Sequence, residues 1–470
     1  MLSPIGSGRT LAHGRAGAIR HLMRHSPARL HKDRVTALHP GTKPLGFDQI
    51  YEGRHSMSDP DIIIIGAGAA GIGAGLDCAA RGLSFVILEG ADRVGGRAYT
   101  ASGGLERTWD WGCHWLHCAT ENPLVAHADR LGARYDSAPR EDYVSYWKDG
   151  FASGQSAAEA EASFDHFFDT IYDAGKAGQD IAVSDVMPPP DQWRPTMRMI
   201  FQLLSGDDPE VVSAAGYSDY ADVDADWPVL TGYGALIAAM AQGLPIHLGT
   251  PVRAVRHTAN GVEVDTDTGT LRAKAAIVTV SANVLQSGAI AFGPGPAADL
   301  VADMETITCG SYEKVAFTLT DMPAEFQGKL FTSIDTGNDA GPLNFQIVED
   351  GAPMVINHIG GTPAREVSAA GPEAMIDLAT QHLVAAFGAE FTKMITGTAT
   401  TSWTEDPLIL GSYSHAQPGS AQLRRDIIAR DTGRVGFAGE AFSLKWQATA
   451  HGAYQSGRDV VARMAGTLSL

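Results

Sequence analysis

Between residues 61 and 88 the hydrophobic and polar positions follow the order strand, turn, helix, strand. Ile62–Ile65 is a run of four β-branched residues, which is typical of a buried strand. A glycine-rich turn occupies 66–71, and the pattern from Ile72 to Arg81 predicts a helix. Phe85–Leu88 is the next predicted strand. This order is typical of the start of an α/β domain with a parallel sheet.

The pattern changes twice further along the chain. Residues 151–227 carry helical patterns that are interrupted by a run of prolines at 188–190. Short strands return after residue 250, so we expect an α/β domain assembled from discontinuous segments, with α+β pieces forming a second domain. The later predicted strands are Val252–Arg256, Val262–Asp265, Ile277–Val280 and Val315–Leu319.

Composition and charge narrow the class of protein. The 470 residues are 44% hydrophobic and 19% charged, which is an ordinary globular mixture and excludes a disordered or fibrous chain. The net charge of −19 argues against nucleic acid or an anionic membrane surface as a partner and fits cationic partners. No stretch of about 18 or more apolar residues is present, so no membrane span is predicted.

The four cysteines are too few for a disulfide framework. Two of them flank two histidines in the segment Cys113-His114-Trp115-Leu116-His117-Cys118, but no second cluster completes a tetrahedral set of ligands. We therefore predict no metal site.

The first 57 residues differ from the rest of the chain. They hold nine arginines and lysines against three acidic residues, without the apolar core of a secretory signal. This segment is either a basic organelle-targeting sequence, or it has no targeting role and is a disordered leader or a stretch upstream of the true start at Met57. We favour the second interpretation, with a cytoplasmic protein, and expect Met57–Leu470 to fold and work alone.

A glycine motif joins the first predicted strand to the first predicted helix. Gly66, Gly68 and Gly71 form G-x-G-x-x-G, which permits a tight turn, a close backbone approach to a pyrophosphate and close helix packing. Glu89 ends the next strand, where its carboxylate can accept hydrogen bonds from a ribose. In this context the motif predicts dinucleotide binding.

A second glycine pair follows at Arg93-Val94-Gly95-Gly96-Arg97, and Arg97 can neutralise pyrophosphate charge. From Glu89 to Arg97 the sequence resembles the second cofactor segment of the flavin-containing amine oxidases. That family includes monoamine oxidases, polyamine oxidases and lysine-specific histone demethylases. The resemblance continues, in family order, through 110–115, 122–124, 230–234, 250–255, 310–315, 403–414, 437–440 and 451–457.

The resemblance implies a Rossmann-like FAD-binding domain built from 58–130, 228–300 and 401–470. The substrate-binding domain, a mixed sheet plus helices, would then be formed by 131–227 and 301–400, and 1–57 would be a basic leader. The FAD contacts implied by the resemblance are Gly66, Gly68, Ala70 and Gly71 at the diphosphate turn, Glu89 on the ribose, Arg97 near the pyrophosphate, His114 and Trp115 beside the isoalloxazine, Val252 on adenine, Glu440 at the ribityl–pyrophosphate region, and Thr449 and Ala450 at the flavin.

The resemblance also implies two catalytic residues. Lys314 would point inward and hold a water against the flavin N5, and Tyr413 would line the substrate site. Some members attach FAD through a cysteine where this chain has Ser412, so the FAD is predicted to be non-covalent. Thr449 stands where some members have a second tyrosine, which disfavours an aromatic monoamine. Ser281 stands where proline is common.

These features predict an FAD-dependent oxidase that converts an amine to an imine, with O₂ as acceptor and H₂O₂ as product. The substrate would be a small cationic amine, a polyamine or alkylamine, because residues 151–230 hold fifteen acidic residues against three basic ones. An L-amino-acid oxidase is an alternative, with Arg194 or Arg198 for the carboxylate. A flavin-binding protein without turnover is another. His117 and His451 are either proton carriers or structural histidines.

Overall fold

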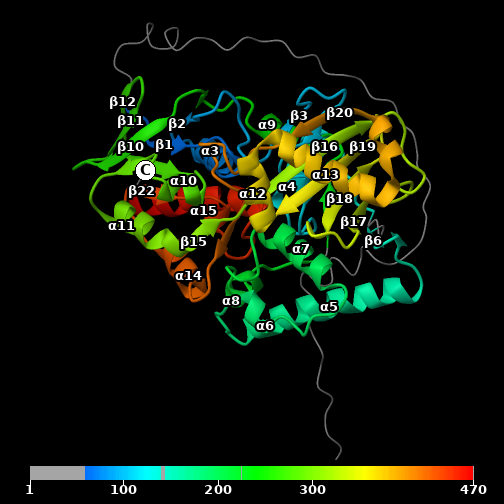
Figure 1. Ribbon diagram of the computed structural model, residues 1–470. Coiled ribbons are helices and arrows are strands. Elements are labelled where there is room, and N and C mark those ends of the chain that lie inside the picture. Colours follow the sequence, from blue (N-terminus) through cyan, green and yellow to red (C-terminus); the bar gives the residue numbers. More distant parts are fainter. Residues whose placement is uncertain (1–58, 139–142, 224, 469–470) are drawn as a thin grey trace, which may run out of the picture.

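The computed structural model describes residues 59–138, 143–223 and 225–468 of the chain. The predicted basic leader lies outside the described residues. The fold has two lobes, each organised around one central sheet, with the long helix α5 (Gln155–Lys176) along one edge (Figure 1). Within the described residues, no helix combines the length and the apolar character that crossing a membrane requires.

The first lobe contains a five-stranded parallel sheet in the order β22-β13-β1-β2-β9. One face packs on α3, α4, α9 and α15, and the opposite face packs on α10, α11 and a four-stranded sheet in the order β12-β11-β10-β14. The bounds are β1 Ile62–Ile65, β2 Phe85–Leu88, β9 Ile246–His247, β13 Ala275–Val278, β22 Val435–Phe437, α3 Ala69–Arg81, α4 Pro123–Leu131, α9 Tyr233–Met240, α15 Ala450–Leu468, α10 Ala282–Gln286, α11 Pro296–Asp303, β10 Val252–His257, β11 Val262–Thr266, β12 Gly269–Ala273 and β14 Ala291–Phe292.

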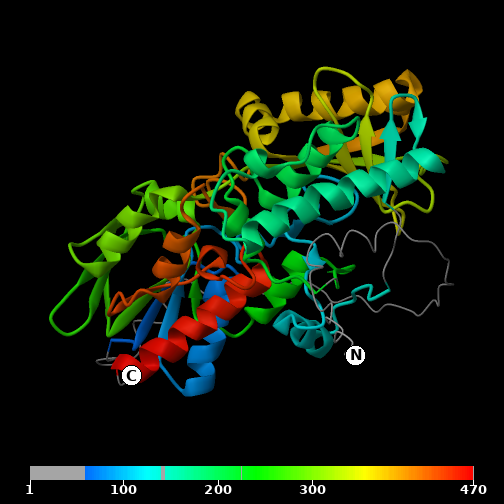
Figure 2. The same cartoon turned by 90° about the horizontal axis from the view of Figure 1, so that it is seen from below.

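Helices α3 and α15 lie side by side beneath this sheet (Figure 2). Glycines make the close packing possible, because a Cβ at Gly73 would lie 2.4 Å from the carbonyl oxygen of Tyr454, and one at Gly457 would lie 2.0 Å from that of Ala70. The small residues of the predicted helix therefore serve helix packing as well as the turn.

The second lobe contains a seven-stranded mixed sheet in the order β20-β16-β19-β18-β17-β6-β7. Its apolar face packs on α12 and α13. Helices α5, α6, α7 and α8 form a separate cluster around buried phenylalanines. The bounds are β6 Tyr143–Trp147, β7 Gly150–Phe151, β16 Tyr312–Leu319, β17 Phe331–Asp335, β18 Leu343–Val348, β19 Met354–Gly360, β20 Ile395–Thr400, α12 Gly361–Ala370, α13 Pro372–Phe387, α6 Val183–Val186, α7 Arg194–Ser205 and α8 Ala214–Ser218.

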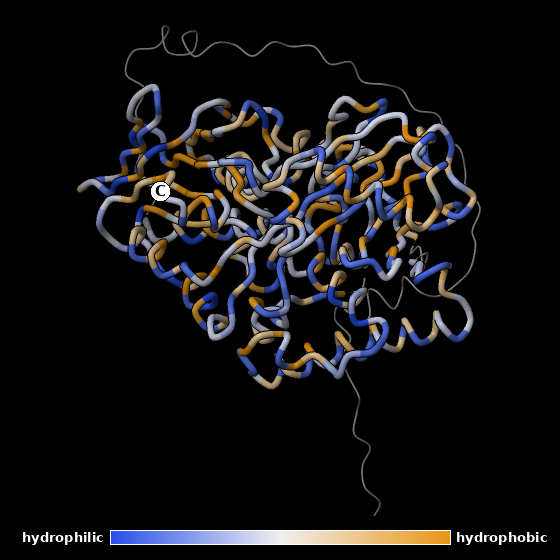
Figure 3. Tube along the Cα trace, viewed as in Figure 1, coloured by the Kyte–Doolittle hydropathy of each residue, from blue (hydrophilic) through white to orange (hydrophobic). Residues whose placement is uncertain are grey.

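The hydrophobic segments concentrate inside both lobes (Figure 3).

Short strands and helices complete the fold. Two-stranded pairs join β3 to β4, β5 to β8 and β15 to β21. Their bounds, with those of the remaining helices, are β3 Thr100–Ala101, β4 Trp109–Asp110, β5 Trp115–Leu116, β8 Trp227–Pro228, β15 Ile307–Cys309, β21 Ser414–Ala416, α14 Ala421–Ala429, and the 3₁₀ turns Met304–Thr306, Ala389–Met394 and Glu440–Phe442.

The predicted fold class is confirmed, since a parallel sheet assembled from distant segments is joined to a mixed sheet with helices. The strands at Ile62–Ile65 and Phe85–Leu88 are also confirmed. The first helix begins at Ala69, three residues earlier than predicted, and the strand predicted at Ile277–Val280 begins at Ala275. Buried alanines, which carry little strand signal, pair with β1 and β22 there. The exact domain boundaries stay predictions.

Candidate cofactor and active site

Two glycines of the turn between β1 and α3 stand where a side chain would be strained or would clash. Gly66 has a φ of +106°, and a Cβ at Gly71 would lie 1.9 Å from the carbonyl oxygen of Gly66. Gly68 is the N-cap of α3 and offers no side-chain cap. The turn therefore presents the helix N-terminus, with its partial positive charge, to an anionic group.

Glu89 follows β2 and folds back over this turn. Its carboxylate accepts hydrogen bonds from the N–H groups of Ala67 (2.6 Å) and Ala91 (2.9 Å). Burial raises the pKa of Glu89, and these two hydrogen bonds offset part of that rise. The N–H of Thr250 donates to the carbonyl oxygen of Glu89 at 2.7 Å, which places Val252, the first residue of β10, near the end of β2.

The second glycine pair packs directly on the first turn. The N–H of Gly95 donates to the carbonyl oxygen of Ala67 at 2.9 Å, and Gly68 and Gly95 form a parallel bridge. Arg97 follows, and its guanidinium donates to the carbonyl oxygen of Ser412 and, at 3.1 Å, to the carboxylate of Glu440. Both glycine segments and Glu440 are thus brought together from distant parts of the sequence.

Glu440 lies between two arginines. Arg424 is 1% exposed and donates to the Ser414 hydroxyl (2.9 Å) and to the carbonyl oxygen of Glu440 (3.2 Å). Although burial raises the pKa of Glu440, Arg97, Arg424 and the hydrogen bonds from Ser414 hold it below its ordinary value. Two guanidinium groups against one carboxylate leave a surplus positive charge, which suits a diphosphate.

Lys314 lies on β16 with its side chain inside the protein and 4% exposed. Its Nζ donates to the carbonyl oxygens of Asp110 (2.9 Å) and Gly112 (2.7 Å). Burial lowers the pKa of Lys314 to about 8, against the smaller opposing effect of Asp110. The amine is therefore poised to exchange a proton near neutral pH.

A chain of buried polar groups continues from Asp110 to the second lobe. Its carboxylate lies 2.7 Å from His114 Nδ1, and the Gln346 amide donates to His114 Nε2 at 3.1 Å. This requires the hydrogen on Nδ1, which donates to Asp110. The neighbouring Trp115 ring lies 5.8 Å from that of Phe331 on β17. The segment 110–115 is thus held against the second sheet.

Glu313 fastens the strand of Lys314 to the loop after β20. Its carboxylate is fully buried and accepts hydrogen bonds from the Thr401 hydroxyl (2.5 Å) and from the N–H groups of Trp403 (3.1 Å) and Thr404 (2.8 Å). The Trp403 indole donates in turn to the carbonyl oxygen of Trp111 at 3.1 Å. Glu313 therefore holds the loop at 401–404 against β16, the strand that carries Lys314.

The remaining predicted site residues are Tyr413 and two residues at the start of α15, Thr449 and Ala450. The Tyr413 hydroxyl donates to the carbonyl oxygen of Leu203, and its ring lies 6.1 Å from that of Tyr312. The Thr449 hydroxyl accepts from the N–H of Gly452 at 3.0 Å and thereby caps the helix that begins at Ala450. Thr449 thus has a structural partner at the position predicted to face the flavin.

The histidines and cysteines of segment 113–118 do not converge. His114 lies against Asp110, His117 Nδ1 lies 2.8 Å from an Asp226 carboxylate oxygen, and Cys118 Sγ lies 3.2 Å from the Tyr220 hydroxyl. Burial lowers the pKa of His451 to about 3, so this imidazole is neutral at physiological pH.

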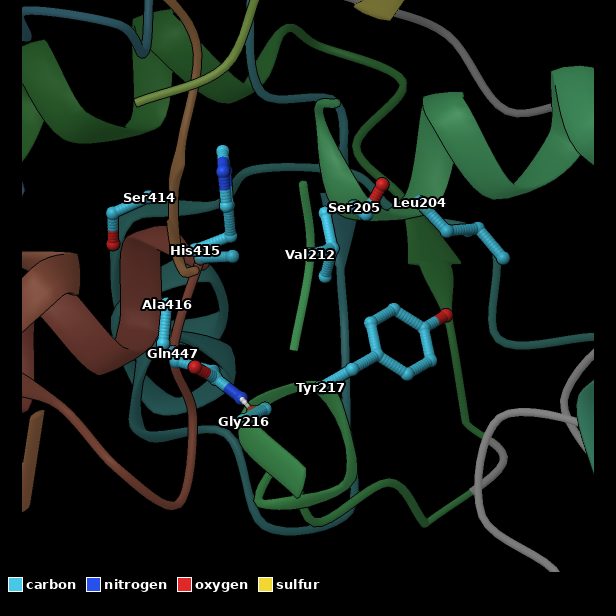
Figure 4. Close-up of a pocket in the computed structure, with 10 residues that line it drawn as sticks. Leu204, Ser205, Val212, Gly216, Tyr217, Ser414, His415, Ala416 and Gln447 are labelled. Atoms are coloured by element: carbon cyan, nitrogen blue, oxygen red, sulfur yellow. Dashed lines mark hydrogen bonds between the residues drawn. The ribbon is translucent and has the colours of Figure 1, made fainter. Parts of the chain in front are cut away.

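A cavity of about 20 Å³ lies beside β21 (Figure 4). It is lined by His415 and Gln447, whose amide donates to the carbonyl oxygen of Gly216 at 2.6 Å. Burial lowers the pKa of His415 to about 4. The space is about the size of one water molecule, which is too small for an amine substrate.

The predicted cofactor residues fit an FAD. The glycine turn exposes a helix N-terminus without a side-chain cap, and three buried donors, namely Arg424 Nε, Arg424 Nη1 and the Ser412 hydroxyl, have no partner among the described residues. The residues form three adjoining groups. The turn, Glu89 and Val252 make the first, Arg97 and Glu440 the second, and Lys314, His114 and Trp115 the third.

Several residues of this region escaped sequence reasoning. Asp110 and Glu313 lie inside recognised segments, and a carboxylate in a strand that is otherwise apolar is a signal that was available. Arg424 gave no such signal, because it is one of two adjacent arginines on an amphipathic helix. His358 also gave none, since only the pairing of β16 with β19 sets it opposite Lys314.

Comparison with known sequences agrees with this geometry. The family described as flavin containing amine oxidoreductase matches residues 69–465. Polyamine oxidase 4 of Oryza sativa subsp. japonica is 28% identical over 448 residues, covering 86% of this chain and 88% of that protein. Lysine-specific histone demethylase 1 homolog 2 of Arabidopsis thaliana is 26% identical over 457 residues, covering 89% of this chain. This chain spans only 59% of the length of that demethylase.

Solved structures share the fold. Cyclohexylamine oxidase from Brevibacterium oxydans IH-35A superposes with a TM-score of 0.73 at 22% identity, covering 88% of this chain and all of that one. A putrescine oxidase redesigned in its cofactor binding gives 0.71 at 17% identity, covering 87% of this chain and 99% of that one.

Proposed function

Because this chain belongs to the flavin-containing amine oxidoreductases, with FAD as its cofactor, we propose that it oxidises a small cationic amine of the alkylamine or polyamine class. The amine loses two electrons and two hydrogens to become an imine, and O₂ takes them up as H₂O₂. Water then hydrolyses the imine. The names of the polyamine, cyclohexylamine and putrescine oxidases support this class of substrate.

The observation that carries the proposal is the buried Lys314. When bound, FAD supplies the oxidation itself, since its ring accepts the hydrogen and electrons from the carbon beside nitrogen. Lys314 Nζ is fixed by two carbonyl oxygens and retains one further hydrogen with which to hold a water molecule. With its pKa near 8, the amine can give or take a proton there.

The surroundings of the two candidate carboxylate-binding arginines favour amines over amino acids. Arg198 makes two hydrogen bonds of 2.6 Å to Glu210. Arg194 donates to the carbonyl oxygen of Pro188 and lies 5.6 Å from the Phe167 ring centre. Both guanidinium groups therefore already have partners within their own segment.

Several acids of residues 151–230, the acidic segment, have partners within the fold. Asp219 pairs with Arg425 at 2.7 Å, and Asp207 pairs with Arg365 at 2.8 Å. Asp180 accepts from the Ser213 hydroxyl at 2.5 Å. These acids hold the fold together, while the negative potential of the whole segment raises the local concentration of a cation.

The test is a peroxide assay on the purified, yellow protein with alkylamines, polyamines, L-amino acids and an N-methylated lysine peptide. Amine-dependent peroxide release supports the proposal. Release with amino acids alone contradicts it in favour of an amino-acid oxidase, and release with the peptide alone favours a demethylase. Lys314→Met should retain FAD and slow reoxidation by at least tenfold in stopped-flow traces. Lys393→Met, an exposed lysine, is the control.

A further inference from the structure

One face of the seven-stranded sheet carries a row of polar side chains. The register sets Lys314 opposite His358, His358 opposite Asn344, Asn344 opposite Ser333, and Ser333 opposite Ser145. Directly paired residues point to the same side of a sheet, so these five residues, the polar row, share one face. All five are buried.

The polar row faces the candidate active site. The alternate residues, such as Val315 and Ile359, pack on α12 and α13 on the opposite face. On the face of the polar row, Lys314 reaches the carbonyl oxygens of Asp110 and Gly112. The polar row therefore lies against the segment that is predicted to border the flavin.

Within the polar row, His358 is the residue with a ring nitrogen that can form a further hydrogen bond. Its Nδ1 lies 2.7 Å from the Tyr312 hydroxyl, and its Nε2 is buried without a partner among the described residues. The side chain is only 5% exposed. Further along the row, the Ser333 hydroxyl is hydrogen-bonded to the Tyr143 hydroxyl. A buried nitrogen without a partner costs stability, unless a ligand supplies the missing partner.

Aromatic rings surround this imidazole on the side of the predicted site. The Tyr312 ring lies 5.8 Å away and the Phe331 ring 6.1 Å. Tyr413 adjoins Tyr312, and Trp115 adjoins Phe331. His358 thus stands between the residue predicted to line the substrate and a residue predicted to border the flavin.

The chemistry of this position favours a neutral partner. Burial, with repulsion from Lys314 and His114, holds the pKa of His358 far below its ordinary value, so the imidazole is neutral. A second ammonium group would meet the positive charge of Lys314, which is the only formal charge in the polar row. A hydroxyl both donates and accepts, so it matches either tautomer of His358.

We propose that Nε2 of His358 is a substrate contact that selects amines carrying a hydroxyl group two or three carbons from the oxidised nitrogen. This rests on the proposed amine oxidase function. Adjacent strands lie about 4.8 Å apart, so a chain of two or three carbons spans the distance between the backbones of β16 and β19, which carry Lys314 and His358. A diamine or an amino acid would lack this match.

The experiment compares kcat/KM for three compounds of the same length, namely propanolamine, n-butylamine and trimethylenediamine, with β-alanine as the carboxylate. In the wild-type holoenzyme we expect propanolamine to exceed n-butylamine by about tenfold, the effect of one hydrogen bond in a buried site. His358→Leu should bring this ratio to about one, and His358→Gln should restore part of it. His166→Leu, an exposed histidine on α5, should leave the ratio unchanged.

Ratios within one variant do not depend on flavin content, so they separate recognition from folding. A wild-type ratio near one, or an unchanged ratio in His358→Leu, would overturn the inference. A preference for trimethylenediamine or β-alanine would overturn it as well. If His358→Leu does not retain FAD, the wild-type ratio and His358→Gln decide. Absence of peroxide with every amine would instead refute the proposed function.

Discussion

Replacing Lys314 with methionine tests whether its buried amine lowers the stability of the protein at neutral pH. Burial lowers the pKa of Lys314 to about 8, compared with 10.5 for the ordinary side chain. The native protein therefore binds this proton less tightly than the unfolded chain does. Below about pH 8 both states carry the charge, and burying it destabilises the folded state.

The direction and the size of the pH effect on stability follow from the native and unfolded pKa values of Lys314. Between about pH 8 and pH 10.5, Lys314 is protonated to a larger extent in the unfolded chain than in the native protein. The free energy of unfolding therefore rises with pH in this range. The gain from pH 7 to pH 10 is roughly 2–3 kcal/mol. Methionine cannot titrate, so the variant lacks this gain. It also leaves the carbonyl oxygens of Asp110 and Gly112 without their donor, a cost of about 1–3 kcal/mol that does not depend on pH.

Urea unfolding of the holoenzyme, followed by tryptophan fluorescence at both pH values, measures the difference between wild type and Lys314→Met. We expect that difference to change by roughly 2–3 kcal/mol in favour of the wild type at the higher pH. Lys393→Met, which alters an exposed lysine, should track the wild type at both pH values. Parallel stabilities for wild type and Lys314→Met would refute the reasoning and imply that Lys314 titrates as a surface residue.

Four further outcomes are expected. Gly71→Ala should purify without flavin colour, because its Cβ would lie 1.9 Å from a backbone oxygen, whereas Gly150→Ala, in open space, should stay yellow. Acid precipitation should release FAD to the supernatant, since Ser412 provides no thiolate, and a yellow pellet would contradict this. KM for a cationic amine should rise with salt, because exposed charges are screened beyond about 8–10 Å, and a flat salt profile would exclude attraction by the acidic segment. Glu313→Gln should lower stability by about 2–4 kcal/mol in thermal unfolding, since its amide would face the Trp403 N–H, and an unchanged Tm would show that the loop is held otherwise.

The glycine turn and its acid were within reach of the sequence because their chemistry is local. Gly66, Gly68, Gly71 and Glu89 belong to one strand–turn–helix–strand unit, where spacing alone determines the geometry. The same holds for β1 and β2, whose apolar runs are buried on both faces. Roles carried by resemblance, such as those of Thr449 and Val252, stay predictions.

The environment of Lys314 depended on tertiary structure. Alternation along β16 indicates that Glu313 and Lys314 point to opposite faces, but it does not say which face meets solvent. In this protein neither face meets solvent, because both faces of the sheet are covered. Glu313 and Lys314 are therefore both buried. A sequence pattern that is typical of a surface strand therefore places a buried carboxylate on one face of the sheet and a buried amine on the other.

The sequence by itself determined the dinucleotide turn and the family, since the turn rests on neighbouring residues and the family on short motifs in a fixed order along the chain. Tertiary structure alone decided the pairing of Arg424 with Glu440 and of His358 with Lys314. Strand register sets His358 opposite Lys314, and the packing of α14 brings Arg424 to Glu440. Their charge states and open hydrogen bonds arise from shared burial, which is a property of the assembled protein and of no single segment.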